Sequence, residues 1–351
     1  MDVTESFLTL EYILKAKKVR TEGSVRIDLL GGTIDLVPLN FILRDTVTLN
    51  IATSLKAKVE IEETKSNLKI VSIDYGNSFT YEEKEFKTKN FISDHFGPMS
   101  FVCQILDHFS VTKNITLTLS SGSPPGAGLG GSSSMGVTLY KCLCEYTDRP
   151  FNRMEAINVV QAIESKILNK GPCGYQDYYP ALYGGVLALV PRNEGVQVEQ
   201  FHSEALSQEL EQRLTLVYSG ALRLSAINNW EVYKSFFDGD TLVTKGLKSI
   251  AKLARQAYEA LNKENYDQFF DLICREGETR EGLFTNIVTT EMKDIRDDLL
   301  EKNLIDGMKV CGAGGGGCFI LVHSAKNRDI IRKEVEDSGL QVLDFKVDKP
   351  L

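Results

Sequence analysis

The residues in this sequence that are best suited to chemistry are carboxylates and hydroxyls beside glycine-rich segments. Ser132–Ser134 follow the glycine run Gly122–Gly131, and Glu164 and Asp177 flank a second loop that contains Gly, Pro and Cys. Hydroxyl and carboxylate oxygens are the ligands that a hard cation such as Mg²⁺ prefers. Two acids beside a loop that can bind phosphate are what metal-assisted phosphoryl transfer requires.

The first glycine run lies between two predicted elements. Asn114–Ser120 alternates apolar residues with Thr and Ser, which predicts a half-buried strand. Met135–Tyr146 is apolar and has no Gly after Gly136, which predicts a helix. The backbone N–H groups of such a loop and the positive end of the helix dipole together form an anion site, most often for phosphate.

Two other nucleotide-binding motifs fit this run less well. A P-loop needs a Lys directly after its glycines, and none is present here. Gly126–Gly131 formally matches the G-x-G-x-x-G turn of dinucleotide-binding folds, which makes an NAD-dependent oxidoreductase an alternative. That turn requires an acid about 20 residues further on, at the end of a second strand, but Phe151–Glu164 has the pattern of a helix.

The segment G-S-P-P-G-A-G-L-G-G-S-S-S resembles the phosphate-binding motif P-x-x-x-G-L-G-S-S-A-A of the galactokinase, homoserine kinase, mevalonate kinase and phosphomevalonate kinase (GHMP) superfamily. The resemblance implies that Ser132 ligates Mg²⁺ together with Glu164; the alternative for Glu164 is an ordinary carboxylate on a helix surface. The residues that it implies for binding the phosphates of ATP are Pro125, Gly126, Ala127, Gly128, Leu129, Gly130, Gly131, Ser132, Ser133 and Ser134.

An earlier segment, R-I-D-L-L-G-G-T-I-D-L-V-P, is similar to the R-I-x-x-x-G-G-x-T-D-x-P segment of heptose-phosphate kinases and fucokinases. It departs from the G-E-H-T-D of galactokinase, because Gly32 replaces the Glu and no His is present. The resemblance implies that Asp35 accepts a sugar hydroxyl, that Gly32 lines the acceptor site, and that Arg26 lowers the pKa of the reacting hydroxyl. The alternative is that Arg26 and Asp28 form a solvent-facing salt bridge on a strand, Ser24–Leu30.

Two further segments complete the resemblance. G-P-C-G-Y-Q-D is similar to the superfamily's P-C-G-I-M-D-Q or G-x-Q-D-Q, which implies that Asp177 orients or deprotonates the acceptor and that Gly174 lies beside it. K-V-C-G-A-G-G-G-G is similar to K-x-x-G-A-G-x-G-G, which implies that Gly315 and its neighbours support the site from a second domain. Arg223, on the turn G-A-L-R-L-S, could hold an anionic group of the acceptor or be an ordinary surface residue.

The composition limits the remaining classes of function. The chain has 351 residues, enough for two domains, and a net charge of -8, which argues against a general nucleic-acid binder. Its seven cysteines show no zinc or disulfide spacing, which favours a reducing, cytoplasmic location. No signal peptide or membrane span is indicated, so we expect a small-molecule partner, no membrane association, and a monomer or homodimer.

The expected fold class is α+β. The resemblance implies a ribosomal-protein-like N-terminal domain, residues 1–200, and a ferredoxin-like C-terminal domain, residues 201–351, with the active site in the cleft between them. Other predicted elements are strands at Val47–Glu62, Leu68–Ile73, Tyr183–Val190, Leu214–Ser219, Cys318–Val322 and Gln341–Val347; helices at Glu5–Lys18, Pro98–Phe109, Arg153–Asn169, Thr241–Lys263, Asn265–Glu281, Met292–Lys302 and Asn327–Asp337; a turn at Thr64–Asn67; and a linker at Arg192–Glu204.

The resemblance implies transfer of the γ-phosphoryl group of ATP, with Mg²⁺, to a hydroxyl of a sugar or sugar phosphate. The Gly32 position favours a heptose phosphate over galactose. A galactokinase or mevalonate-type kinase is the alternative within the superfamily. A non-catalytic ligand sensor on the same fold is the alternative outside catalysis, and it would be favoured if Asp177 or the serine run were missing, but both are present.

Overall fold

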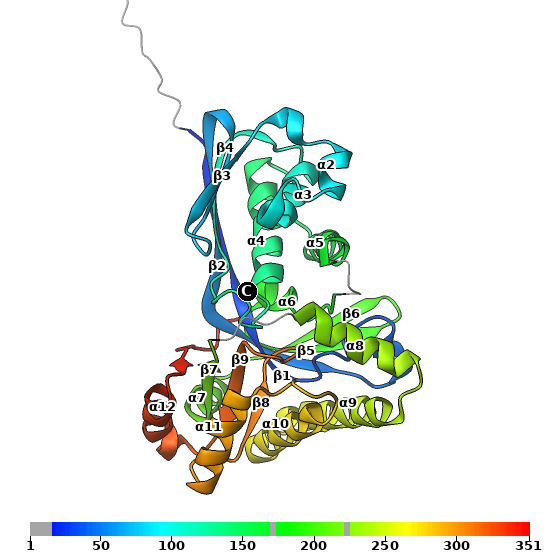
Figure 1. The fold of residues 1–351 in the computed structure, drawn as a ribbon, viewed down its shortest axis with the longest axis vertical. Coiled ribbons are helices and arrows are strands. Elements are labelled where there is room, and N and C mark those ends of the chain that lie inside the picture. The colour runs from blue at the N-terminus through cyan, green and yellow to red at the C-terminus, as the bar shows by residue number, and fades with distance from the viewer. Residues whose placement is uncertain (1–15, 169–172, 221–224) are drawn as a thin grey trace, which may run out of the picture.

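The computed structural model describes residues 16–168, 173–220 and 225–351. The described chain forms two lobes, each built on a sheet that helices cover (Figure 1). The strands are β1 (Lys18–Leu30), β2 (Thr48–Ser72), β3 (Asn77–Tyr81), β4 (Lys113–Ser120), β5 (Val186–Arg192) and β6 (Gly195–Phe201) in the first lobe, and β7 (Leu214–Tyr218), β8 (Gly307–Val310), β9 (Cys318–Val322) and β10 (Gln341–Val342) in the second. The first sheet has the order β1-β2-β5-β6, with β3 and β4 also paired to β2, and the second has the order β10-β7-β9-β8.

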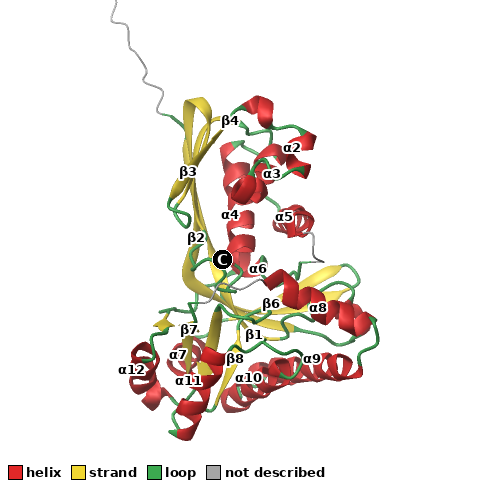
Figure 2. Cartoon of the chain, viewed as in Figure 1, coloured by secondary structure: helices red, strands yellow, loops and turns green. Residues whose placement is uncertain are grey.

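Helices cover these sheets (Figure 2). Apolar side chains form the contacts between them. In the first lobe, Val137 and Leu143 of α4 belong to the same buried cluster as Ile61 of β2. The helices are α1 (Leu39–Ile42), α2 (Thr88–Ile92), α3 (Ser100–His108), α4 (Gly131–Tyr146), α5 (Arg153–Leu168), α6 (Tyr179–Tyr183), α7 (Glu204–Arg213), α8 (Ser225–Phe237), α9 (Thr241–Asn262), α10 (Tyr266–Glu281), α11 (Thr290–Glu301) and α12 (Arg328–Asp337).

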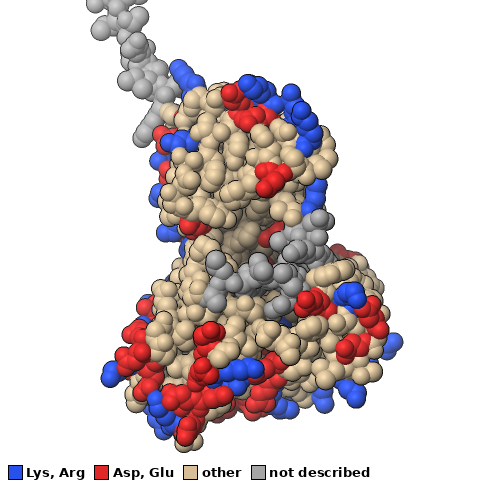
Figure 3. Space-filling model, in the orientation of Figure 1, with Lys and Arg blue, Asp and Glu red and all other residues tan. Residues whose placement is uncertain are grey.

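Strand β1 belongs to the cores of both lobes. Val25 and Leu29 of β1 lie in one buried apolar cluster with Leu216 of β7 and Phe269 of α10. This shared core fixes the end of β1, and therefore the loop that follows it, against the second lobe. On the face in Figure 3 the molecule narrows between the two lobes, and acidic side chains gather over the lower one.

The linker predicted at Arg192–Glu204 is wrong. Those residues form the hairpin of β5 and β6, with register from Val186 opposite Phe201 to Arg192 opposite Gly195, and then enter α7. Strand β6 lies at the edge of the sheet and has no fully buried residue, so its sequence lacks a clear alternation of apolar and polar residues.

The turn predicted at Thr64–Asn67 is confirmed, because the chain reverses direction there while β2 continues without a break. Before the turn, Lys58 to Glu63 lie opposite Ser120 to Ile115; after it, Lys69 to Ser72 lie opposite Thr116 to Leu119, so the two halves of β2 run in opposite directions along β4.

Two terminal predictions also change. The helix predicted at Glu5–Lys18 falls mostly on residues 1–15, which lie outside the described residues, and Lys18 already belongs to β1. The strand predicted at Gln341–Val347 is only two residues long, Gln341–Val342, because the chain then leaves the second sheet.

The segment after β10 returns to the first lobe. Val347 forms an isolated β-bridge with Thr53 of β2. Asp348 accepts a hydrogen bond from the Gly185 N–H at 3.1 Å through its backbone carbonyl, and one from Ser24 Oγ at 2.7 Å through its carboxylate. The segment therefore ties β1 and β2 to the start of β5.

Candidate active site

The first glycine loop leads directly into α4. Gly126, Gly128 and Gly130 have φ angles of 70°, 75° and 68°, a region that side chains disfavour. A Cβ at Gly130 would lie 3.2 Å from both Cβ and Cγ of Asp177, so Gly130 also permits the close approach of that carboxylate. The glycines thus shape the loop and bring it against Asp177.

Helix α4 begins at Gly131, four residues earlier than predicted, so the serines occupy its first turn. Ser133 Oγ donates a hydrogen bond to Glu164 Oε2 at 2.8 Å. Ser134 Oγ instead donates to the Ser24 carbonyl at 3.0 Å and is fully buried. Ser132 and Ser133 therefore face the site, whereas Ser134 fastens α4 to β1.

Glu164 of α5 is held by hydroxyl donors. Tyr178 donates to Glu164 Oε2 at 2.7 Å, the same oxygen that Ser133 binds, and Ser132 is a further hydrogen-bond partner of this carboxylate. Burial raises the pKa of Glu164, and the hydrogen bonds from Tyr178 and Ser133 act in the opposite direction. The alternative of an ordinary surface carboxylate is wrong, because Glu164 is only 9% exposed.

Arg26 and Asp177 form an ion pair beside the loop. Arg26 Nε and Nη2 donate to Asp177 Oδ1 at 2.9 and 2.7 Å, which leaves Asp177 Oδ2 free of Arg26. Arg26 Nη1 also donates to the Gly128 carbonyl, and the Arg26 N–H donates to the Leu129 carbonyl at 2.9 Å. Burial disfavours the guanidinium cation, but the carboxylates of Asp177 and Asp28 outweigh it and raise the pKa of Arg26. The pair can align a hydroxyl with a phosphate in the loop.

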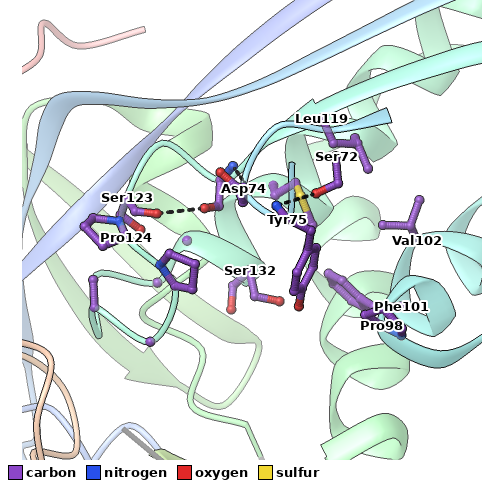
Figure 4. A pocket seen from close by; sticks show the side chains of 18 of the residues that line it. Ser72, Asp74, Tyr75, Pro98, Phe101, Val102, Leu119, Ser123, Pro124 and Ser132 are labelled. Carbon is purple, nitrogen blue, oxygen red and sulfur yellow. Dashed lines mark hydrogen bonds between the residues drawn. The ribbon is translucent and has the colours of Figure 1, made fainter. Parts of the chain in front are cut away.

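A cavity of about 310 Å³ joins these groups (Figure 4). Tyr75, Pro98 and Phe101 lie together on one side of it, Pro124 lies on the other, and Ser132 lies between them. None of its described lining residues is Lys or Arg, so backbone N–H groups and the α4 dipole would meet the charge of a phosphate. The lining residues are Ser72, Asp74, Tyr75, Pro98, Met99, Phe101, Val102, Leu119, Ser121, Ser123, Pro124, Pro125, Gly126, Ala127, Gly128, Gly130, Gly131, Ser132, Ser133, Met135, Glu164 and Asp177.

The predicted acceptor residues meet near Asp177. Asp35 Oδ2 accepts a hydrogen bond from the Gln176 N–H at 3.0 Å, and a Cβ at Gly174 would lie 2.2 Å from the same oxygen. Burial raises the pKa of Asp35 to about 7. A Cβ at Gly32 would lie 3.0 Å from Gln176 Nε2, so Gly32 is close to the same segment. Arg223 lies outside the described residues.

Sequence analysis missed a buried group of four charges, which we call the interlobe charge cluster: Asp28, Glu276, Arg280 and Lys309. Lys309 Nζ lies 3.3 Å from Asp28 Oδ2 and 3.7 Å from Glu276 Oε2, and Glu276 accepts from Arg280 Nε at 3.2 Å. Burial opposes ionisation of Asp28, but Lys309, Arg280 and Arg26 lower its pKa. The solvent-facing salt bridge between Arg26 and Asp28 is wrong, because they are 1% and 0% exposed. Two features of the sequence could have indicated this cluster: Lys309 at the start of the segment K-V-C-G-A-G-G-G-G, and the i, i+4 spacing of Glu276 and Arg280.

The second glycine loop, Gly312–Gly317, packs on the first. A Cβ at Gly317 would lie 2.7 Å from the carbonyl oxygens of both Gly126 and Ala127, and the Cys318 N–H donates to Ala127 at 2.6 Å. Gly315 donates to the Ile287 carbonyl at 2.8 Å and does not line the cavity. This loop therefore supports the phosphate loop from behind.

Known proteins resemble this chain in sequence. The chain matches the family model "GHMP kinases N terminal domain" over residues 98–185 and "GHMP kinases C terminal" over residues 257–339. It is 26% identical over 343 residues to D-glycero-alpha-D-manno-heptose 7-phosphate kinase of Campylobacter jejuni, covering 95% of this chain and 97% of that protein. It is 25% identical over 342 residues to bifunctional fucokinase/GDP-fucose pyrophosphorylase of Arabidopsis thaliana, covering 93% of this chain but only 32% of that longer protein.

Solved structures confirm the fold. A crystal structure of mevalonate kinase superposes with a TM-score of 0.73 at 21% identity, covering 94% of this chain and 99% of that one. A putative sugar kinase from Campylobacter jejuni gives 0.72 at 22% identity, covering 95% and 99%.

The fold and the matches define a phosphotransferase that acts on alcohol groups. The chain belongs to the GHMP kinase family, whose members use ATP, and its two-domain α+β fold is confirmed. The NAD-dependent alternative is wrong, because the glycine loop lies in this fold rather than in a doubly wound parallel sheet. Among the described helices, none combines the length and apolar character needed to cross a membrane.

Proposed function

We propose that the protein transfers the γ-phosphoryl group of ATP to a hydroxyl of a sugar or sugar phosphate, with a heptose phosphate as the favoured acceptor. The observation that carries the proposal is the Arg26–Asp177 pair, which lies against Gly128 and Gly130. Asp177 of this pair lines the same cavity as Glu164. Asp177 Oδ2 would accept or orient the proton of the attacking hydroxyl, and Arg26 would offset negative charge at the reacting centre.

In this proposal the Gly126–Gly131 backbone and the first turn of α4 hold the phosphates of ATP. Ser132 and Glu164 would hold Mg²⁺, and their oxygens suit a hard cation. The hydrogen bond between Ser132 and Glu164 supports that assignment, because it brings the oxygens of both residues close enough to share one cation. When bound, Mg²⁺ neutralises charge on the phosphates.

The acceptor side favours a hydroxyl-rich molecule. Asp35, Gly32 and Gly174 lie together beside Asp177, and Gln176 Oε1 is a buried oxygen without a partner among the described residues. A hydroxyl donor of the acceptor could satisfy such an oxygen. Arg223 remains a proposed partner for an anionic group of the acceptor, and Gly315 a proposed contributor to its site.

The Gly32 position supports a heptose phosphate over galactose. A Cβ at Gly32 would lie 2.1 Å from Asp28 Oδ2, so the Glu that galactokinase carries there has no room in this chain. The similarity to a heptose 7-phosphate kinase over 95% of this chain supports the same choice. Galactokinase or mevalonate-type activity and a non-catalytic sensor are the competing functions.

An ATP-consumption screen over sugars, sugar phosphates and mevalonate tests the proposal. We expect the highest kcat/KM with a heptose phosphate. A higher value with galactose or mevalonate would reverse the choice of acceptor, and ATP binding without turnover on any acceptor would favour the sensor. We also propose a cytoplasmic location and a monomer or homodimer. The proposed domain boundary lies between residues 200 and 201, and the end of β6 at Phe201 supports it.

A further inference from the structure

The loop after β1 contains a residue in an unfavourable backbone conformation. Thr33 has a φ of 72°, and its side chain is branched at Cβ. A positive φ is a genuine outlier for a β-branched residue. Such residues persist only where surrounding contacts hold them, and they cluster at functional sites. Thr33 is buried two residues before Asp35, so the contacts that hold Thr33 also constrain Asp35.

Arg280 of α10 holds two successive residues of this loop. Its Nη2 donates to the Gly32 carbonyl at 2.8 Å, and its Nη1 donates to Thr33 Oγ1 at 3.1 Å. Thr33 Oγ1 in turn donates to Asn229 Oδ1 of α8 at 3.4 Å. Helices α8 and α10 therefore both form hydrogen bonds with the loop that follows β1.

The interlobe charge cluster fixes Arg280 in place. Glu276, one helical turn earlier, is fully buried and accepts from Arg280 Nε at 3.2 Å. Lys309 lies between Glu276 and Asp28, so two cations balance two carboxylates. A guanidinium has five donors in a planar fork and can bind Glu276, the Gly32 carbonyl and Thr33 together, which an ammonium group cannot reproduce.

We propose that Arg280 is a positioning residue for the phosphoryl acceptor. By binding Thr33 and Gly32, it holds the loop from Gly31 to Asp35 in the strained form that presents Asp35 to the acceptor. The inference rests on the proposed assignment of Asp35 to the acceptor site. Neither Arg280 nor Thr33 lines the cavity beside the phosphate loop, so their effect falls on the acceptor and not on ATP.

A matched pair of variants tests the proposal with heptose 7-phosphate as acceptor. Thr33→Val keeps the shape of the side chain and removes the hydroxyl, whereas Thr33→Ser keeps the hydroxyl. We expect Thr33→Val to raise the KM for the acceptor by about 10- to 100-fold, the scale of a misplaced binding group, while the KM for ATP stays unchanged. Thr33→Ser should restore wild-type values, and Arg280→Lys should resemble Thr33→Val.

Amide hydrogen exchange without any ligand provides a second measurement. Residues 31–36 should exchange faster in Thr33→Val and Arg280→Lys than in the wild type or Thr33→Ser. Unchanged exchange there, or a KM increase that is equal for ATP and acceptor, would overturn the positioning role. If the wild-type protein phosphorylates no acceptor, the proposed function fails on its own, and the exchange of residues 31–36 still decides the role of Arg280.

Discussion

Two groups of opposite charges in this molecule differ in how far solvent reaches them. Arg26 pairs with Asp177, whose side chain is 27% exposed and lines the cavity. Lys309 pairs with Asp28 and Glu276, and all three side chains are fully buried. A carboxylate that acts on a substrate must be reachable, while a closed group of charges can only organise the chain around it. The first group should therefore control rate, and the second should control stability and geometry.

The largest expected effect is that of Asp177→Asn on the rate. The amide keeps the shape of the side chain and loses its charge and basicity, so kcat should fall by about 10²–10⁴-fold, the usual contribution of a general base. ATP affinity should stay near that of the wild type, because in the proposed arrangement the glycine loop holds the phosphates of ATP. Steady-state kinetics and ATP-binding calorimetry measure the two quantities.

A pH–rate profile separates the possible roles of Asp177. A base gives an acidic limb that the variant lacks, whereas a purely orienting group does not. If Asp177→Asn keeps more than about a third of wild-type kcat, the loss is smaller than the smallest loss expected from removing a general base. That result would show that Asp177 has no catalytic role.

Lys309→Met should mainly reduce stability. It leaves Asp28 and Glu276 buried with less compensation, and breaking a buried pair in this way costs about 3–5 kcal/mol of unfolding free energy. Lys302→Met is the matched control, because Lys302 also pairs with two carboxylates but its side chain is 42% exposed. Exposed pairs contribute about 0–1 kcal/mol. Equal losses in urea denaturation of the two variants would contradict the comparison.

Asp35 should make stability depend on pH. Its pKa is raised from 3.8 to about 7 by burial, so the folded protein keeps a proton that the unfolded chain has already released. Stability is therefore lost as the pH rises from about 4 to about 7, by up to about 4 kcal/mol, and is level above that window. Asp35→Asn cannot ionise and should lack this loss. Parallel stability curves for the two proteins in urea denaturation from pH 4 to pH 8 would exclude a raised pKa.

The smallest expected effect is that of removing the Tyr178 hydroxyl on Mg²⁺ binding. Tyr178→Phe removes a hydrogen bond to Oε2, and loss of such a supporting contact typically weakens metal binding by about 10-fold or more. The Mg²⁺ concentration for half-maximal ATP binding in calorimetry should rise accordingly. Tyr179→Phe, at the adjacent buried position, is the control and should leave it unchanged. Equal Mg²⁺ dependence in both variants would move the metal to another group.

Much of the site could be predicted because its residues lie in short motifs. Arg26, Asp35, Glu164 and Asp177 each follow or precede a glycine-rich segment. The structure brings Arg26, Glu164 and Asp177 together at the glycine loop, and Asp35 contacts the segment that carries Asp177. Ser134 could not be assigned, because only the packed structure shows that its hydroxyl faces β1. The same contact explains the early start of α4, where tertiary hydrogen bonding overrides the weak helix propensity of Gly and Ser.

Other elements left too weak a pattern in the sequence. Helix α7 buries only Leu206 and Leu210, so its apolar face is a single pair at i, i+4. Strand β6 is an edge strand with no fully buried residue. The interlobe charge cluster was missed because a single sequence does not reveal which distant charges are paired. Its members Asp28 and Lys309 are 281 positions apart.

The bond between Asp348 and Ser24 bears on how the protein is made. Asp348 leaves the ribosome 324 residues after its partner, an interval on the order of tens of seconds at ordinary rates of translation. During that time the nascent first lobe has its apolar core but lacks the segment that joins β1, β2 and β5. The carbonyl of Ser24 anchors the helix that carries the serines, so this anchoring strand is completed only after the second lobe has been synthesised. The contacts of Val347 and Asp348 with Thr53, Ser24 and Gly185 are therefore among those of the first lobe that form late in synthesis.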